Sequence, residues 1–427
     1  MRARSTERTS RLLAVALAGA MALAACAEDS DGASGGSGSG QGVPFGATKE
    51  QYLAAFENIS PIVIRTQTPA PKGSPTGARN EDYIKAVEEW SGGKIKFEVA
   101  YANAVAQPAE ADDALRDGRL HLTNTMPVYE PSEYPAAVAL NDASFQGRQT
   151  PLVGVMATHA WMVEVAFNTP KIMEEFDKAG MHVLIPAFMS GHSLMVCSDR
   201  RTSLADFRGM QILSGGQTQS KEIEALGAVP MSVPYNEVFE SLQRKVAKCT
   251  VSTLLGVDLG GYAEVANKVT SSPDVGYSIT TGTFAIEKEF WESLPLVAKQ
   301  LLFDRLDVFL ESSIKGTWQA SARAVDAILK AGGSFQEYAP DAAQALRAAN
   351  EQLLQQARAN SALGDGGAFV DRVKASSDKW SQKVVDLGYQ DVDDFVKFAE
   401  LINQNPPDLR PFIDAVFQEI LLPHRPS

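Results

Sequence analysis

The sequence contains few of the residues that hold metal ions or carry redox chemistry. Only three cysteines and five histidines occur in 427 residues, and neither type recurs at the short spacings typical of metal and redox sites. His-Glu-x-x-His, Cys-x-x-Cys and the phosphate-binding glycine loop do not occur either. We therefore expect no metal ion and no cofactor. Because a catalytic triad is assembled in space, an enzyme stays open as an alternative.

Positive charge is also scarce in this chain. Lysine and arginine total 39 against 52 aspartates and glutamates, which gives a formal net charge of −13. Binding to phosphate backbones needs a basic face, so we expect no nucleic-acid partner. With 44% hydrophobic and 21% charged residues, the composition is that of a globular protein and excludes wholesale disorder, collagen and coiled coils.

The first 25 residues have the pattern of an export signal. Four arginines between positions 2 and 11 precede an apolar stretch over 12–25, which is too short to span a bilayer comfortably. The stretch ends in Leu23-Ala24-Ala25-Cys26, which resembles a bacterial lipobox. We predict a lipoprotein signal peptide over 1–25 and a lipidated Cys26, so that the protein is extracytoplasmic and lipid-anchored to the cell membrane. A plain signal peptide with a chance cysteine is the alternative.

A linker and two α/β units follow the signal. We assign 26–58 to the lipidated cysteine and a flexible Gly/Ser-rich linker. After position 61 the hydrophobic pattern alternates between strand and helix, as in parallel sheets with crossover helices. We predict a first lobe from 59–186 plus about 275–300. A second lobe comprises 187–274 plus about 301–427 and ends in a helical tail.

Short segments carry the predicted elements of each lobe. In the first lobe we expect a helix over 78–90 that stops at Gly92-Gly93. The strands expected around it lie at 62–64, 94–101 and 120–123, with a second helix over 109–117. A second run of elements begins with a strand at 181–185, which closes the first lobe, and continues in the second lobe with strands at 194–196, 210–213, 231–233 and 246–251 and helices over 204–207, 216–226 and 236–245.

Two cysteines remain after the predicted signal. Outside the cytosol, two thiols are more often paired than free, so Cys197 and Cys249 are expected to form a disulfide. The alternative is that both act as small buried hydrophobic residues.

Two segments of the second lobe carry a family resemblance. The first is Leu204-Ala-Asp-Phe-Arg-Gly-Met-Gln-Ile-Leu213, and the second runs from Ala225-Leu-Gly-Ala-Val-Pro to Glu237-Val-Phe-Glu-Ser-Leu-Gln243. Together they resemble the DctP-type solute receptors of tripartite ATP-independent periplasmic (TRAP) transporters. A weaker likeness begins at Ser74-Pro-Thr-Gly-Ala78, and the resemblance covers about 60–335.

This resemblance implies a fold and a function. The fold is α/β, a two-lobe periplasmic-binding-protein fold (type II-like, Venus flytrap) with a long connecting helix and a helical C-terminal region. The lobes of such a receptor close around one small organic solute, which is then delivered to membrane permease subunits. An exported hydrolase and a solute sensor on the same scaffold are the alternatives.

The chain departs from the family at the positions that usually bind the ligand. Leu213 stands where the family places an arginine that holds a substrate carboxylate, and Ser193 stands at a second such position. We therefore expect a ligand other than a standard C4-dicarboxylate. Either the solute is neutral or more apolar, or a carboxylate is held elsewhere, by Lys72, by His192 or by backbone N–H groups of the turn 213–217.

Ligands of open α/β sheets bind at the carboxyl ends of the strands. The residues that we expect there are Gln67, Thr68, Thr125, Met126, Tyr129, Phe188, His192, Leu213, Ser214, Gln217, Tyr235 and Ser252.

Overall fold

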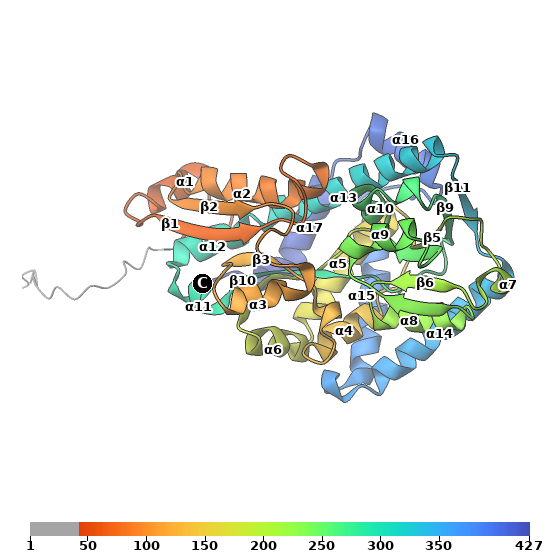
Figure 1. Ribbon diagram of the computed structural model, residues 1–427. Coiled ribbons are helices and arrows are strands. Elements are labelled where there is room, and N and C mark those ends of the chain that lie inside the picture. The colour runs from red at the N-terminus through yellow and green to blue at the C-terminus, as the bar shows by residue number, and fades with distance from the viewer. Residues whose placement is uncertain (1–41) are drawn as a thin grey trace, which may run out of the picture. The chain divides into compact units, whose positions relative to one another are not determined.

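The computed structural model describes residues 42–427, so the expected signal peptide and Cys26 lie outside the described residues (Figure 1). Two mixed β-sheets organise the described chain. The first has the order β2-β1-β3-β10-β4 and the second the order β11-β9-β5-β8-β6-β7. The α/β organisation in two lobes that we predicted from the sequence is thereby confirmed.

The first sheet is mixed, with two parallel and two antiparallel pairings. Its strands are β1 (Ile62–Gln67), β2 (Ile95–Ala100), β3 (Leu122–Thr125), β4 (Met181–Phe188) and β10 (Gly282–Glu287). Strand β1 pairs in parallel with β2 and β3, as the alternating pattern predicts, whereas β10 is antiparallel to both β3 and β4.

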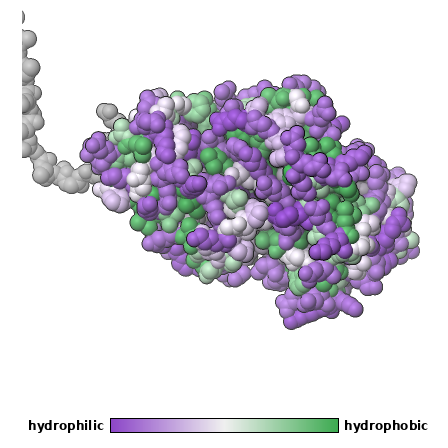
Figure 2. Space-filling view, turned by 90° about the horizontal axis from the view of Figure 1, so that it is seen from above, coloured by the Kyte–Doolittle hydropathy of each residue, from purple (hydrophilic) through white to green (hydrophobic). Residues whose placement is uncertain are grey.

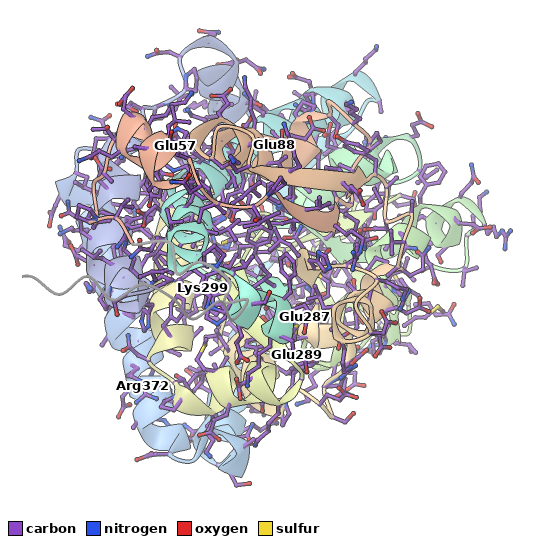
Figure 3. All side chains as sticks on the ribbon, turned by 90° about the vertical axis from the view of Figure 1, so that its left-hand side faces the viewer. Glu57, Glu88, Glu287, Glu289, Lys299 and Arg372 are labelled. Atoms are coloured by element: carbon purple, nitrogen blue, oxygen red, sulfur yellow. A yellow bond between two sulfur atoms is a disulfide. The ribbon has the colours of Figure 1, made fainter. Side chains whose placement is uncertain are left out.

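Helices cover this sheet, and their buried side chains form the core of the first lobe together with those of the strands. They are α1 (Lys49–Ala55), α2 (Ala78–Trp90), α3 (Ala111–Arg116), α4 (Pro135–Asp142), α5 (Val153–Phe167), α6 (Pro170–Lys178), α11 (Lys288–Ser293) and α12 (Leu296–Asp304). Tyr83 on α2 meets the ring of Phe284 on β10 edge-on at 5.2 Å. Glu88 ties α2 to β2 by accepting a hydrogen bond from the Phe97 N–H, and Glu287 caps α11 (Figure 3).

The second sheet forms the other lobe. Its strands are β5 (Leu194–Cys197), β6 (Gln211–Ser214), β7 (Val229–Ser232), β8 (Cys249–Ser252), β9 (Lys268–Ser271) and β11 (Ser334–Glu337), and its helices include α7 (Leu204–Phe207), α8 (Gln217–Ala225), α9 (Val238–Gln243) and α10 (Leu254–Gly260). In the antiparallel pair β5–β8, Cys197 lies opposite Cys249, and their sulfur atoms are bonded at 2.09 Å.

The chain passes between the two sheets three times. It leaves the first sheet after β4, returns along 272–281 between β9 and β10, and crosses again along the 25-residue helix α13 (Leu306–Lys330) before β11. Helix α13 packs against α2 of the first lobe and α10 of the second (Figure 1). It is therefore the long connecting helix that the family resemblance implies.

The C-terminal helices differ from the predicted division of the chain. These helices are α14 (Pro340–Arg358), α15 (Gly366–Asp386), α16 (Phe395–Gln404) and α17 (Arg410–Val416). Helix α14 packs on α8 of the second lobe, but α15 packs along α5 of the first, and α16 and α17 pack on α13. The reason is that α5 is buried almost all round and needs a second helix on the side that β4 leaves open.

The linker is shorter than predicted, because the chain is folded well before position 58. Tyr52 on α1 is fully buried, and its hydroxyl donates to the Asp304 carboxylate on α12 at 2.6 Å. Phe45 stacks on Phe417 near the C-terminus at 5.3 Å. These aromatic anchors place 43–58 in the first lobe.

Most of the large apolar side chains lie inside the two lobes. On the face shown in Figure 2, hydrophilic residues predominate and hydrophobic ones form separate patches. Within 42–427, no helix combines the length and apolar character needed to cross a membrane.

Polar side chains fasten the returning segment 272–281 to both lobes. The Glu222 carboxyl on α8 accepts hydrogen bonds from the Ser278 N–H at 2.9 Å and the Ser278 hydroxyl at 2.8 Å. From the first lobe, the Ser144 hydroxyl accepts a bond from the Ile279 N–H at 2.6 Å. Burial raises the pKa of Glu222 to about 8, and the nearby Asp142 adds to the effect of burial.

The raised pKa of Glu222 predicts a pH-dependent stability. Between pH 4.5 and 8 the folded protein holds a proton on this carboxyl that the unfolded chain has lost, so folding stability falls as pH rises through this window. Glu222→Gln removes this contribution. Urea unfolding should therefore show that the wild type loses stability relative to Glu222→Gln between pH 5 and pH 8. An equal difference at both pH values would contradict the prediction, and Glu224→Gln, at an exposed position of the same helix, is the control.

The cysteine pair gives a second prediction. Closing a loop between positions separated by 52 residues stabilises the fold by about 4 kcal/mol in the chain-entropy description. In a Cys26→Ser protein, we expect no maleimide labelling after denaturation without reductant, and labelling of both thiols after reduction. Reduction should also lower the urea midpoint. Labelling of unreduced protein would show that the thiols are free.

Candidate ligand-binding site

A cavity of about 150 Å³ lies between the two sheets. Both lobes contribute to its wall. The first lobe supplies, among others, Arg79, Asn103, Asn124, Met126, Tyr129 and Phe188, and the second supplies Ser214, Gln219, Tyr235, Ser252, Leu255 and Tyr262.

The wall is built where strands end. Met126 follows β3, Phe188 ends β4, Ser214 ends β6 and Ser252 ends β8. The carboxyl ends of strands from both sheets therefore meet at one place, which is the usual position of a ligand in α/β folds. Of the residues that we expected at the site, those lining the cavity are Met126, Tyr129, Phe188, Ser214, Tyr235 and Ser252.

Arg79 is the one cavity-lining side chain of the described protein that carries a full charge at neutral pH. It is only 8% exposed, and its guanidinium lies over the ring of Phe188, with 4.4 Å from Cζ to the ring centroid. Its Nε is buried without a hydrogen-bond partner among residues 42–427. Burial lowers the pKa of Arg79 to about 10, and the adjacent Tyr235 hydroxyl opposes this shift. The cavity thus presents an unpaired cation beside an aromatic face.

The position of Arg79 on its helix is unusual. Arg79 stands in the first turn of α2, where the helix macrodipole is positive and a cation is unfavourable. The N-cap residue, Gly77, makes no side-chain capping bond. A 3₁₀ turn over Pro75–Gly77, capped by the Ser74 hydroxyl, leads into α2. The positive end of the helix dipole therefore adds to the charge of the guanidinium and does not offset it.

Phe188 is held in place below Arg79. Its ring meets Phe309 of α13 edge-on at 5.8 Å. On the other side, Gly282 approaches so closely that a Cβ there would lie 2.4 Å from the Phe188 ring. Glycine is required at 282 because any larger residue would displace the ring on which Arg79 rests.

Several expected ligand residues support the wall without lining it. Gln67 fixes the following loop, since its amide donates to the Ala106 carbonyl at 3.0 Å and accepts from the Ala106 N–H at 3.1 Å. The Thr68 carbonyl accepts a bond from the Asn103 N–H at 3.1 Å. Thr125, the last residue of β3, is buried beside the cavity but outside its wall.

Of the two anion sites that we expected in the second lobe, His192 does not face the cavity as a charged group, and one N–H of the turn 213–217 is already bound within the lobe. His192 is buried outside the wall, and burial lowers its pKa to about 4, so that it is neutral at pH 7. In the turn 213–217, the Gly215 N–H is already used by the Gln219 side chain at 2.8 Å. Gln217 is exposed. Lys72 is also exposed and lies outside the wall.

Leu213 lies behind the cavity wall. It is fully buried and belongs to the same hydrophobic core as Val196 and Leu242. The expectation that this position lines the pocket is corrected by the structure: Leu213 packs in the core, and the cation of the site comes from the first lobe instead.

Sequence reasoning missed Arg79, Asn103 and Tyr262. A usable signal existed for Arg79 alone, because an arginine in the first turn of a helix opposes the macrodipole and calls for a reason. Asn103 lies in a loop and Tyr262 begins a short 3₁₀ helix, and the sequence context marks neither of them as a ligand-site residue.

The sequence of this chain matches one known protein family. Residues 67–360 match the family of bacterial extracellular solute-binding proteins, family 7, named DctP. This match confirms the resemblance that we drew from the two second-lobe segments.

Solved structures of similar fold come from TRAP solute-binding proteins. One from a marine metagenome, specific for aromatic acid ligands and in complex with 3-hydroxybenzoate, is 21% identical with a TM-score of 0.65, over 75% of this chain and 99% of that chain. One from Bordetella bronchiseptica with bound mandelate is 19% identical with a TM-score of 0.65 and the same coverage. One from Rhodoferax ferrireducens with benzoate is 18% identical with a TM-score of 0.66, over 76% and 99%. These likenesses show the two-lobe periplasmic-binding-protein fold.

The place of Leu213 leads to a prediction. Leu213→Arg would bury a cation without a partner, which destabilises proteins by on the order of 3–5 kcal/mol. We expect this variant to lose stability in urea unfolding and to gain no affinity for carboxylates. Leu213→Met, which keeps the volume and the apolar character, should cost less than about 1.5 kcal/mol. A stable Leu213→Arg protein with new carboxylate affinity would show that position 213 reaches the ligand.

Proposed function

Because this chain belongs to the bacterial extracellular solute-binding proteins of family 7, we propose that it captures a small organic monocarboxylate and delivers it to the membrane permease of a TRAP transporter. The chain is a solute-binding receptor of the TRAP type, and small organic acids are the ligands of this class. The identity of the ligand, the lipid anchor and the delivery step are the parts that we propose.

The unpaired guanidinium of Arg79 is the observation that carries the proposed ligand. A buried charge without a partner costs free energy, so its retention needs a compensating interaction. A carboxylate provides one, because its two oxygens match the fork of N–H donors on a guanidinium. No aspartate or glutamate of the described chain lines the cavity, which leaves this role to the solute.

The size and the polarity of the cavity restrict the class of solute that it can bind. About 150 Å³ is the size of an engineered protein cavity that binds benzene. Beyond Arg79, the wall includes the apolar side chains of Met126, Phe188 and Leu255, and a second carboxylate would find no cation there. A single carboxylate on a compact apolar or aromatic body fits these properties. The relatives with 3-hydroxybenzoate, mandelate and benzoate bind acids of this kind.

The compartment and the anchor are proposed from the N-terminal pattern. The signal-like segment over 1–25 and the lipobox-like Cys26 support a receptor tethered to the outer side of the cell membrane by a lipid. A tether keeps the receptor close to the permease, which raises its effective concentration there.

A thermal-shift screen with small ligands tests the proposed charge and size of the solute together. We expect benzoate to raise the thermal midpoint, and a ligand at 100 times its Kd stabilises by about 2.7 kcal/mol. Benzyl alcohol, which has the ring without the charge, and succinate, which has two charges, should give much smaller shifts. Equal shifts for benzoate and benzyl alcohol, or a shift with succinate alone, would contradict the proposal.

Arg79→Gln separates ligand binding from folding. Truncating one side of a buried, hydrogen-bonded charge pair typically costs about 2–5 kcal/mol, so benzoate affinity should fall by roughly 30-fold or more. Since the variant also removes an unpaired buried charge, the ligand-free protein should be at least as stable as the wild type. Arg119→Gln, at an exposed position of the same lobe, is the control. A variant that loses stability and keeps its affinity would assign Arg79 a structural role.

A further inference from the structure

The two lobes touch at the rim of the cavity through side chains of their own. The loop that follows β2 in the first lobe faces the short helical turn at Tyr235–Glu237 in the second. Across this gap the Asn103 Nδ2 group donates a hydrogen bond to the Tyr235 hydroxyl at 2.7 Å. The two residues follow strands of different sheets, β2 and β7, so an opening of the cleft would break this bond.

Tyr235 is held from both sides of the cleft. Within its own lobe, the Tyr262 hydroxyl donates to the Tyr235 carbonyl at 2.8 Å. From the first lobe, the Tyr129 hydroxyl accepts a long bond from the Tyr235 N–H at 3.4 Å. All of these side chains line the cavity together with Asn103. The Tyr235 hydroxyl is therefore at a defined position when Asn103 reaches it.

The loop that presents Asn103 is strained. Ala102 and Asn103 both have positive φ angles, of 54° and 53°. Asparagine tolerates this left-handed region, but alanine does not adopt it readily. The conformation persists because the Ala102 N–H is bound to the Ala70 carbonyl and the Asn103 N–H to the Thr68 carbonyl. Strain of this kind, held by its surroundings, is concentrated at ligand clamps and switches.

These bonds also connect the Ala102–Asn103 loop to the segment between β1 and α2, the helix that carries Arg79. Thr68 and Ala70 belong to the segment that leads from β1 into α2, and Arg79 stands in the first turn of that helix. Arg79 and Asn103 are thus positioned by the same stretch of backbone. A solute bound at Arg79 would lie between the segment that leads from β1 into α2 and Tyr235.

We propose that Asn103 and Tyr235 form a latch that holds the cleft closed over the bound solute, and that the strained Ala102–Asn103 loop sets Asn103 in position for it. The latch rests on the proposed function, because it acts on the same ligand site. Its bond is made in the closed state and broken in the open one, so it favours the closed state. A solute can leave only through the open state. The latch therefore slows dissociation and leaves association nearly unchanged.

The chain offers a matched control for this pair. The Asn236 Nδ2 group donates to the Gln107 Oε1 atom at 3.2 Å, again from one lobe to the other. Both of these residues are exposed and neither lines the cavity. Water replaces such a bond at little cost, so Asn236→Ala should leave the dissociation rate of the solute within about twofold of the wild type.

Stopped-flow kinetics with benzoate tests the latch. The variants are Tyr235→Phe, which removes only the hydroxyl, and Asn103→Gly, which keeps the left-handed backbone accessible. Each should raise the dissociation rate by roughly fivefold, the typical effect of one hydrogen bond, with little change in the association rate. The double variant should dissociate no faster than either single one, because both remove the same bond. Multiplying effects would instead show that Tyr235 contacts the solute directly, and unchanged rates would overturn the latch.

Hydrogen exchange on the full chain distinguishes failure of the latch from failure of the proposed ligand. In the ligand-free protein, Tyr235→Phe should increase exchange in both 101–107 and 235–243, which lie in different lobes. If benzoate does not bind but both segments respond, the ligand assignment is wrong and the latch holds. If benzoate binds and neither the rates nor the exchange change, the latch is wrong and the receptor function is unaffected.

Discussion

The unpaired charge of Arg79 is the constraint on which the site depends. Within the described chain the guanidinium has an aromatic face beneath it, and the cavity wall around it is otherwise uncharged and includes no carboxylate. Such an arrangement is unfavourable in the empty protein, because a buried cation loses its hydration without a compensating partner. The free energy that folding does not recover is available to a ligand that brings the missing negative charge.

The remainder of the fold supports this unfavourable centre. Phe188 is placed by Phe309 on the connecting helix and by the close approach of Gly282, so that the ring below the cation has little freedom. Helix α13 packs on both lobes, and α15 covers the buried α5. Extensive packing away from the cleft offsets the strain at Ala102 and the charge at Arg79, as is common where stability is given up for function.

The sequence predicted many of the helices and strands and part of the ligand site. Helix α2 begins and ends where its spacing indicates, and the strand-end rule found Met126, Phe188 and Ser252 in the cavity wall. Helix α5 was not predicted, because it is apolar on nearly every side and shows no amphipathic period. Leu213 was expected in the cavity wall but packs in the core behind it, and the alternative of a carboxylate held elsewhere was predicted without naming Arg79.

The sequence by itself therefore determined the alternation of strands and helices, the family and the acidic composition, because these depend on local pattern and on counting. Which side chains face one another was decided by tertiary structure. Arg79 and Tyr235 are far apart in the chain and belong to different lobes, and their proximity results from the packing of two sheets across a cleft. The charge of the ligand site follows from that packing, since burial and pairing are properties of a residue's surroundings and not of its position in the chain.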